Sequence, residues 1–260
     1  MSLWVLILLC VIQGLTEFLP VSSSGHLHFV EQIFGVKGNL LLLNLFLHVA
    51  TLFAVVIYYR KIIFNLIKKP FQKYNLYIVI ATFVTLIFAV CYESFEIDRF
   101  VKFIYCFGFL LTSIILLFCH LIQKKGTIVC AENINARRSI IVGAMQGLAV
   151  MPGLSRSGST IGTMIFLGFG EEESSKFSFL LSIPIIVGGF AVELIKFLKN
   201  PIENHFFNIK IYIFAFFLTF FIALIAIKLT IKLLQKKKFI IFSIYTFIMF
   251  VITFVLNFIL

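Results

Sequence analysis

The chain has 260 residues, of which 61% are hydrophobic and 13% are charged, and 34 of them are Phe. Soluble domains carry about a quarter charged residues, so this composition excludes a soluble globular protein. The net charge of +11 does not indicate nucleic-acid binding, because the basic residues lie in short connections between apolar blocks. The five Cys are scattered, with no C-x-x-C pair and no His cluster at metal spacing. The sequence therefore leaves any metal ligand unknown.

Two kinds of apolar segment follow one another along the chain: an interrupted region, three unbroken blocks, a second interrupted region and three more blocks. Each unbroken block has about the 20 residues that an α-helix needs to cross the hydrocarbon core of a bilayer. We therefore predict six transmembrane helices. They cover residues 40–59, 74–92, 101–122, 177–198, 210–233 and 239–259.

The two interrupted regions, 1–36 and 138–170, each contain a polar run rich in Ser, Gly and Pro. Backbone that leaves the helical conformation at membrane depth is tolerated only where it is buried in protein or lines a water-filled cavity. Both regions are therefore predicted as re-entrant helix-loop-helix hairpins. The predicted fold class is an all-α polytopic membrane protein with six transmembrane helices plus two re-entrant helix-loop-helix hairpins.

The two polar runs are related by an internal repeat. A single offset aligns Gln, Gly, Leu, Ser, Ser and Gly of the first run with the same residue types of the second, except that Arg156 takes one position. Each hairpin returns to its own side and is followed by three spans, so the second unit starts inverted, as in many transporter folds. We predict one membrane domain over 1–260, arranged as an inverted repeat of residues 1–122 and 138–260.

The Lys and Arg of the connections predict the orientation, because cytoplasmic loops are enriched in these residues. Fifteen of them fall on the side of the loops 60–73, 123–138 and 171–176 and the segment 228–238, against six on the other side. The first group is expected to be cytoplasmic. Both termini then lie outside, the first hairpin enters from outside and the second from the cytoplasm, so the site is predicted to face the outer side of the membrane.

The two hairpins concentrate the ionisable residues, which are costly inside a membrane domain and mark a reacting site or a substrate path. Glu17 and His26 flank a loop that carries Ser23. The two flanking residues form an acid–base pair, and Ser23 supplies a hydroxyl nucleophile. Arg156 offers a planar pair of donors suited to phosphate oxygens, next to a predicted helix start. Further polar residues are predicted to bind the substrate: Gln13, Ser22, Ser24, Ser155, Ser157 and Thr160.

Some polar residues also have structural interpretations. The serines 22, 23 and 24 are suited to cap the helix that follows them. His48 shares one stripe of the 40–59 span with Asn44 and Thr51, and for this histidine packing or cavity lining is favoured over catalysis.

Three segments carry a resemblance to a known family. Gln13–His26 and Met151–Thr160 resemble the two signature motifs of the bacterial undecaprenyl-diphosphate phosphatase family, also called the bacitracin-resistance family, and Phe177–Pro184 also matches. The resemblance implies a multi-pass enzyme of the bacterial inner membrane. It would remove the terminal phosphate of undecaprenyl diphosphate and so recycle the lipid carrier for peptidoglycan and give bacitracin resistance.

By motif position, the resemblance implies that Glu17 is the essential acid, Ser23 the nucleophile, His26 the catalytic imidazole and Arg156 the phosphate-binding arginine. Gln13 occupies a position where the family has Glu or Gln, so a mechanism with two carboxylates is in doubt here. The family is associated with a divalent cation such as Mg²⁺, which we expect to be carried by the diphosphate. The partners are then a polyprenyl diphosphate lipid and the bilayer, with no nucleic acid.

Several alternatives stay open at this point. Ser23 and His26 are both suited to act as the covalent nucleophile. A transporter or flippase of a phosphorylated polyprenyl lipid has the same architecture and needs the same arginine, and a non-catalytic scaffold is a third interpretation. The metal, a homodimer and the preferred lipid length are not determined by the sequence.

Overall fold

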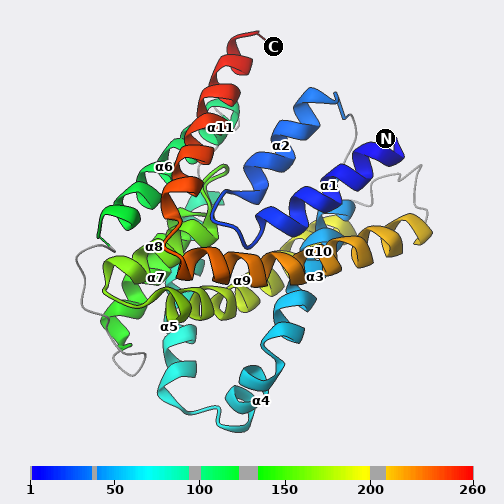
Figure 1. Cartoon of the computed structure of the whole chain (residues 1–260). Helices are drawn as coiled ribbons and strands as arrows, with labels where there is room; N and C mark the ends of the chain where they lie inside the picture. Colours follow the sequence, from blue (N-terminus) through cyan, green and yellow to red (C-terminus); the bar gives the residue numbers. More distant parts are fainter. Residues whose placement is uncertain (1, 37–39, 94–100, 123–133, 200–208, 260) are drawn as a thin grey trace.

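The computed structural model describes residues 2–36, 40–93, 101–122, 134–199 and 209–259 (Figure 1). In these ranges the chain forms eleven α-helices. They are α1 (Leu3–Thr16), α2 (Ser23–Ile33), α3 (Leu41–Tyr58), α4 (Arg60–Lys68), α5 (Lys73–Glu93), α6 (Val101–Ile122), α7 (Ala136–Leu148), α8 (Arg156–Phe166), α9 (Glu171–Lys199), α10 (Ile209–Gln235) and α11 (Phe239–Ile259). The predicted all-helical class is confirmed for the described part of the chain.

Within the described residues, five helices are long and apolar enough to cross a membrane, and they correspond to five of the predicted spans. These are α5, α6, α9, α10 and α11. The remaining prediction, 40–59, meets this test only if α3 and α4 are taken together, and these two helices are bent by 77° at Tyr59. The basic residues of α4 explain the bend, since a helix that carries Arg60, Lys61 and Lys68 is better placed along a membrane surface than through it.

Both interrupted regions fold as a short helix, a turn and a second short helix. Ser22 ends the first turn and accepts a hydrogen bond from the backbone N–H of Gly25 at 3.3 Å, and Ser155 accepts one from Gly158 at 3.0 Å. These side chains satisfy N–H groups that have no partner inside a helix. The two N-caps begin α2 and α8 at equivalent positions of the sequence repeat.

Small residues let each first helix approach a long helix closely. A Cβ added to Gly14 on α1 would lie 2.8 Å from Ile222 on α10, and one added to Gly147 on α7 would lie 2.4 Å from Phe88 on α5. Close backbone approach through glycine is typical of helix packing in membranes. The two residues are equivalent in the sequence repeat, so α1 and α7 are anchored in the same way.

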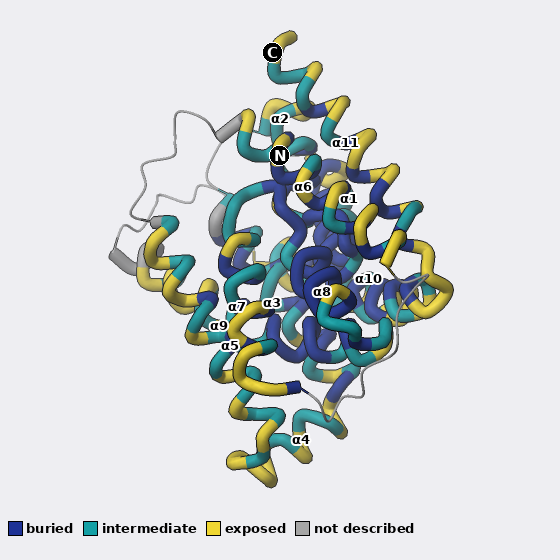
Figure 2. The backbone as a smooth tube through the Cα atoms, turned by 90° about the vertical axis from the view of Figure 1, so that its left-hand side faces the viewer, coloured by how far each residue is buried: buried dark blue, intermediate teal, exposed yellow. Residues whose placement is uncertain are grey.

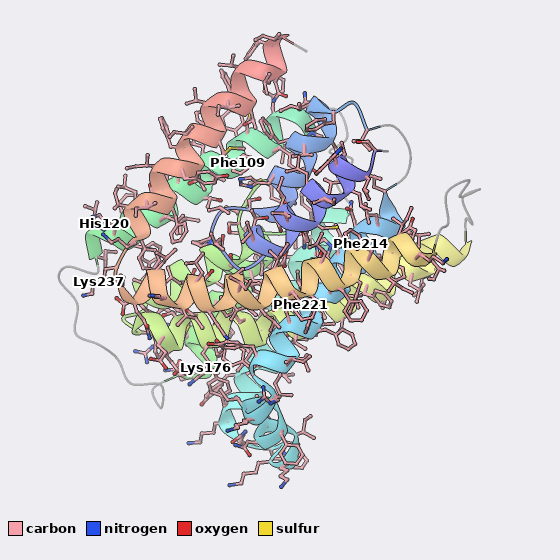
Figure 3. The ribbon with its side chains drawn as sticks, turned by 45° about the vertical axis from the view of Figure 1, so that its right-hand side comes forward. Phe109, His120, Lys176, Phe214, Phe221 and Lys237 are labelled. Atoms are coloured by element: carbon pink, nitrogen blue, oxygen red, sulfur yellow. The ribbon has the colours of Figure 1, made fainter. Side chains whose placement is uncertain are left out.

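The helix α8, which is the second helix of the second pair, lies at the centre of the protein, where Figure 2 shows a concentration of buried residues. The outer faces of the long helices are apolar and exposed. Phe214 and Phe221 on α10 are examples (Figure 3), with 45% and 59% of their surfaces exposed. Exposed apolar bulk of this extent requires an apolar surrounding, which agrees with a protein embedded in lipid.

Several helix ends that border the predicted cytoplasmic loops lie together. Gln235 at the end of α10 donates to Glu172 at the start of α9 at 3.2 Å, and the rings of Tyr74 and Phe177 are 5.7 Å apart. Lys124 and Lys125, which contributed to the orientation, lie outside the described residues. The starts of α5 and α9 and the end of α10 therefore lie close together.

Candidate active site

The turns of the two short helix pairs meet in the middle of the structure. Ser157 donates its hydroxyl to the carbonyl of Leu19 at 2.9 Å, and the backbone N–H of Gly153 donates to Ser24 Oγ at 3.4 Å. Gly153 has a φ of +84° and packs directly on Tyr105, where a Cβ would lie 2.2 Å from the carbonyl oxygen. Only glycine fits such a conformation and such a contact. The two predicted hairpins therefore form one site.

Glu17 is the centre of this site. Its Oε2 atom accepts hydrogen bonds from Ser23 Oγ at 2.7 Å and from Gln13 Nε2 at 3.0 Å, and its Oε1 atom pairs with Arg156. Only 7% of the Glu17 surface is exposed. A buried carboxylate needs such partners, because an unpaired charge would be strongly destabilising. The arrangement places a hydroxyl, a base and a guanidinium in direct contact.

The guanidinium of Arg156 has a nitrogen that donates no hydrogen bond to the described residues. Its Nη2 atom binds Glu17, whereas its buried Nη1 atom has no hydrogen-bond partner among the described residues. Buried donors are nearly always paired in folded proteins, so an unpaired guanidinium nitrogen beside a cavity is suited to an anionic ligand. Phosphate oxygens match this planar group.

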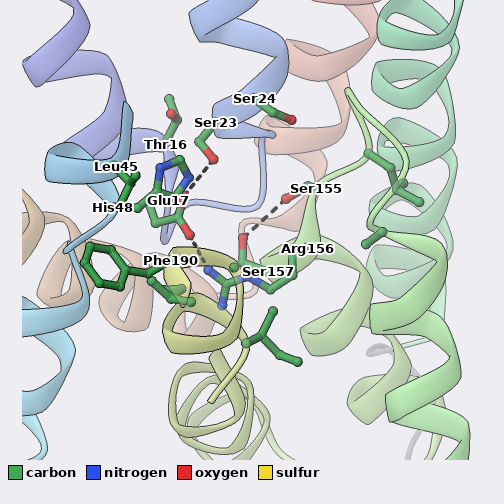
Figure 4. A pocket seen from close by; sticks show the side chains of 15 residues that line it. Thr16, Glu17, Ser23, Ser24, Leu45, His48, Ser155, Arg156, Ser157 and Phe190 are labelled. Atoms are coloured by element: carbon green, nitrogen blue, oxygen red, sulfur yellow. Dashed lines mark hydrogen bonds and ion pairs between the residues drawn. The ribbon is translucent and has the colours of Figure 1, made fainter. Parts of the chain in front are cut away.

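A cavity of about 240 Å³ opens beside these residues (Figure 4). Its polar side is formed by Glu17, Ser23 and Arg156 together with other hydroxyl groups, and its apolar side comes mainly from α3 and α9. The lining residues are Thr16, Glu17, Ser23, Ser24, Leu45, His48, Ala149, Leu154, Ser155, Arg156, Ser157, Ile185, Ile186, Gly189 and Phe190. A pocket with a charged end and an apolar wall fits a phosphorylated lipid better than a small polar molecule.

The structure separates the predicted site residues into two groups. Ser24, Ser155 and Ser157 line the cavity with Glu17, Ser23 and Arg156, whereas the predicted binding residues Gln13, Ser22 and Thr160 do not. Gln13 lies behind Glu17, and Ser22 caps α2. Thr160 faces α9, where its hydroxyl is 2.6 Å from Ser178 Oγ.

His26 also lies outside the cavity lining. Its Nδ1 atom is 2.6 Å from the carbonyl of Ser22 and its Nε2 atom is 2.6 Å from the hydroxyl of Tyr245. The ring packs between Phe109 and the Tyr245 ring, with centroid distances of 5.1 and 5.5 Å. Both nitrogens are thus occupied by protein groups in this arrangement.

The apolar wall was not identified by sequence reasoning. Leu45 on α3 and Ile185, Ile186 and Phe190 on α9 have no distinguishing feature in a sequence in which apolar residues are everywhere. His48 was identified as a polar residue on an inward stripe, and the structure places it on the cavity wall beside Glu17 (Figure 4). Its polar stripe was the signal that pointed to this cavity.

The residues present do not fit a metal held by the protein alone. Within the described ranges, no three His, Cys, Asp or Glu side chains are grouped closely enough to bind a metal ion. The oxygens of Glu17 are already engaged by Ser23, Gln13 and Arg156. Mg²⁺ is commonly bound by one or two carboxylates plus substrate phosphates, and in this site Glu17 is already occupied by protein partners.

The fold and the site together define a multi-pass membrane protein whose two broken helix pairs enclose a pocket suited to a phosphate group. The family model described as bacitracin resistance protein BacA matches residues 6–252, and the chain belongs to this family.

Curated relatives agree over most of the chain. The undecaprenyl-diphosphatase of Carboxydothermus hydrogenoformans is 36% identical over 244 residues, covering 94% of this chain and 93% of that protein. The undecaprenyl-diphosphatase of Thermosipho melanesiensis is 36% identical over 258 residues, covering 96% and 98%. That of Methanobrevibacter smithii is 34% identical and covers 95% of both chains.

Proposed function

We propose that this protein is a membrane phosphatase that hydrolyses undecaprenyl diphosphate to undecaprenyl phosphate and inorganic phosphate. The family and the names of its relatives support this activity. The structural observation that carries it is the hydrogen bond from Ser23 Oγ to Glu17 Oε2, at 2.7 Å, in a pocket that also contains Arg156. A hydroxyl bonded to a carboxylate beside a guanidinium has the parts that phosphoryl transfer needs. In a bacterium, this activity would recycle the envelope lipid carrier and give bacitracin resistance.

Each residue of the pocket has a role in this proposal. Arg156 binds oxygens of the diphosphate and neutralises the charge that develops as the bond breaks. Glu17 removes the proton of Ser23 as its oxygen attacks the terminal phosphorus, and undecaprenyl phosphate leaves with the bonding electron pair. Water then cleaves the phosphoserine and releases inorganic phosphate. Ser23 is favoured over His26 as nucleophile because only Ser23 lines the cavity.

The divalent cation is proposed to arrive on the diphosphate rather than to reside in the protein. Among the lining residues that the structure describes, Glu17 is the only carboxylate, and Arg156 already pairs with it. If this is correct, Mg²⁺ added without lipid produces no saturable binding in titration calorimetry, whereas a chelator lowers phosphate release. Saturable binding of Mg²⁺ to the lipid-free protein would contradict the proposal.

We also propose the complete topology of six spans and two re-entrant hairpins in an inverted repeat, with the site open to the outer face of the inner membrane. The equivalent packing of Gly14 and Gly147 supports the repeat, and the charge of the connections supports the orientation. Lys237, at the basic end of the molecule (Figure 3), provides a test. In a cysteine-free background, Lys237→Cys is expected to react with an impermeant thiol reagent only after the cells are permeabilised.

The activity is tested with purified protein in detergent. The parent is expected to release phosphate from undecaprenyl diphosphate, and Ser23→Ala and Arg156→Ala are expected to reduce the rate by about 100-fold or more. Ser182→Ala is a matched control, because Ser182 is buried on α9, bonds only within that helix among the described residues and does not line the cavity. If the parent binds the lipid and releases no phosphate, the transporter or flippase interpretation is favoured instead.

A further inference from the structure

Among the described residues that line the cavity there is one imidazole, and it belongs to His48 rather than to His26 of the sequence motif. His48 on α3 lines the cavity together with Glu17, Ser23 and Arg156, whereas His26 lies outside it with both ring nitrogens bound to protein groups. Figure 4 shows His48 beside Glu17, and the two side chains are close enough to interact electrostatically. Of these two histidines, His48 is therefore the one that lines the cavity.

A hydrogen bond within α3 determines the tautomer of His48, that is, which ring nitrogen carries the proton in the neutral ring. The Nδ1 atom lies 2.8 Å from the backbone carbonyl of Asn44. A carbonyl oxygen only accepts hydrogen bonds, so Nδ1 must carry the proton and donate it. In the neutral ring the lone pair is then on Nε2, the nitrogen that remains for a group in the cavity. A backbone hydrogen bond of this kind orients an imidazole for proton transfer.

The pocket needs such a group because Glu17 is the only carboxylate among the described residues that line it. Glu17 accepts from Gln13 and Ser23 and pairs with Arg156. Gln13 has an amide, so it cannot take the proton that Glu17 removes from Ser23. Within the described lining, His48 is the remaining side chain with a ring nitrogen that can accept a proton and return it.

We propose that His48 is a catalytic residue that holds the proton between the two halves of the reaction, an inference that rests on the proposed phosphatase function. In the first half, the bond from Ser23 Oγ to the terminal phosphorus forms, and the bond to undecaprenyl phosphate breaks with its electrons on that product. The Ser23 proton passes through Glu17 to His48 Nε2. In the second half, a water oxygen bonds to phosphorus, the bond to Ser23 breaks, and the proton returns to Ser23 by the same route. Inorganic phosphate keeps the two protons of the water.

The other groups around His48 do not compete for this role. Glu17 and Arg156 are the other charged residues that line the cavity. The neighbouring helix α9 faces the cavity with Ile185, Ile186 and Phe190, which do not titrate. On the side of α10, Tyr212 contacts Phe46, with a ring distance of 5.1 Å.

The test compares His48→Gln with His120→Gln, the same substitution at the far end of α6, outside the cavity (Figure 3). The readouts are kcat and KM for undecaprenyl diphosphate from about pH 5 to pH 8, the range in which imidazoles titrate. We expect His48→Gln to lower kcat by about 100-fold with little change in KM. It should also flatten the pH profile in this range, and added imidazole should restore part of kcat. His120→Gln should behave like the parent.

Three outcomes would overturn the proposal. In the first, His48→Gln retains the parental kcat and pH profile. In the second, it loses activity with an unchanged pH profile and no response to imidazole, and this result would indicate a structural role. It could also raise KM alone, which would indicate a binding role. A failure of the proposed phosphatase function is distinguishable from these outcomes, because the parent protein itself would then release no phosphate.

Discussion

The hydroxyl of Tyr245 on α11 lies 2.6 Å from Nε2 of His26 on α2, and the two residues are 219 positions apart in the sequence. The other ring nitrogen of His26 must donate to the carbonyl of Ser22, so in the neutral ring Nε2 accepts a hydrogen bond from the Tyr245 hydroxyl. Ser22 has a φ of +72°, an unfavourable conformation for a residue with a side chain. The chain of hydrogen bonds from α11 thus holds the strained turn that precedes Ser23.

Tyr245→Phe is expected to loosen this turn. His26 is only 5% exposed, and the substitution leaves its Nε2 atom without a hydrogen-bond donor. The loss is expected to lower the free energy of unfolding by about 1–3 kcal/mol. Thermal unfolding in detergent should therefore shift to lower temperature, and kcat should fall several-fold because Ser23 is held less firmly. Tyr77→Phe, away from the cavity, serves as the control. An unchanged unfolding midpoint for Tyr245→Phe would show that the bond does not stabilise the turn.

The two functions of Glu17 can be separated by two substitutions. Glu17→Gln keeps the size of the side chain but cannot take the proton of Ser23, so kcat is expected to fall by about 100- to 10,000-fold. Glu17→Asp keeps the charge opposite Arg156, but its shorter side chain does not span the 2.7 Å contact with Ser23.

We expect both variants of Glu17 to be slow in phosphate release, whereas only Glu17→Gln should also lower the unfolding midpoint, because it removes the buried ion pair. Phosphate release at the parental rate by Glu17→Gln would exclude Glu17 as the base.

The apolar wall of the cavity is expected to contact the lipid chain. Gly189 lines this wall, and a Cβ added there would meet open space. Gly189→Leu should therefore fold normally and fill part of the cavity, raising KM for undecaprenyl diphosphate by about tenfold.

Gly188 provides a matched control for this substitution, because a Cβ at Gly188 also meets open space but the residue does not line the cavity. Gly188→Leu should leave KM unchanged. Equal KM values for the two variants would mean that the lipid chain does not pass along this wall.

Two serines join α6 to α11 by reciprocal hydrogen bonds. Ser113 Oγ donates to the carbonyl of Ser243 at 2.9 Å, and Ser243 Oγ donates to the carbonyl of Ser113 at 2.9 Å. Hydrogen bonds between membrane helices are worth roughly 0.6 kcal/mol on average, so Ser113→Ala and Ser243→Ala should each lower the stability by about this amount.

The double variant Ser113→Ala with Ser243→Ala tests whether these bonds act together. Because the two hydroxyl groups lie 3.3 Å apart, the two effects should not be additive in denaturant unfolding. Catalysis should be unchanged, since neither serine lines the cavity. Strictly additive losses would indicate that the two bonds are independent.

Most of the architecture could be predicted from local patterns. The polar runs at 20–26 and 152–160 indicated breaks in two apolar segments, and the serines 22, 23 and 24 indicated a helix start, which the structure confirms at Ser23. A second helix start was predicted next to Arg156, and α8 begins at Arg156 itself. The bend between α3 and α4 was missed because the 40–59 block is apolar up to the position where the helix turns. Nothing within that block indicates how the following basic residues are oriented.

The sequence by itself determined that the chain is a helical membrane protein and which polar segments form its site, because hydropathy and helix capping act over a few neighbouring residues. Only the tertiary structure decided which side chains face the cavity. His26 turns toward Tyr245 and His48 toward Glu17 because their surroundings come from helices far apart in the chain. The direction of a side chain depends on that packing, and no local pattern contains it.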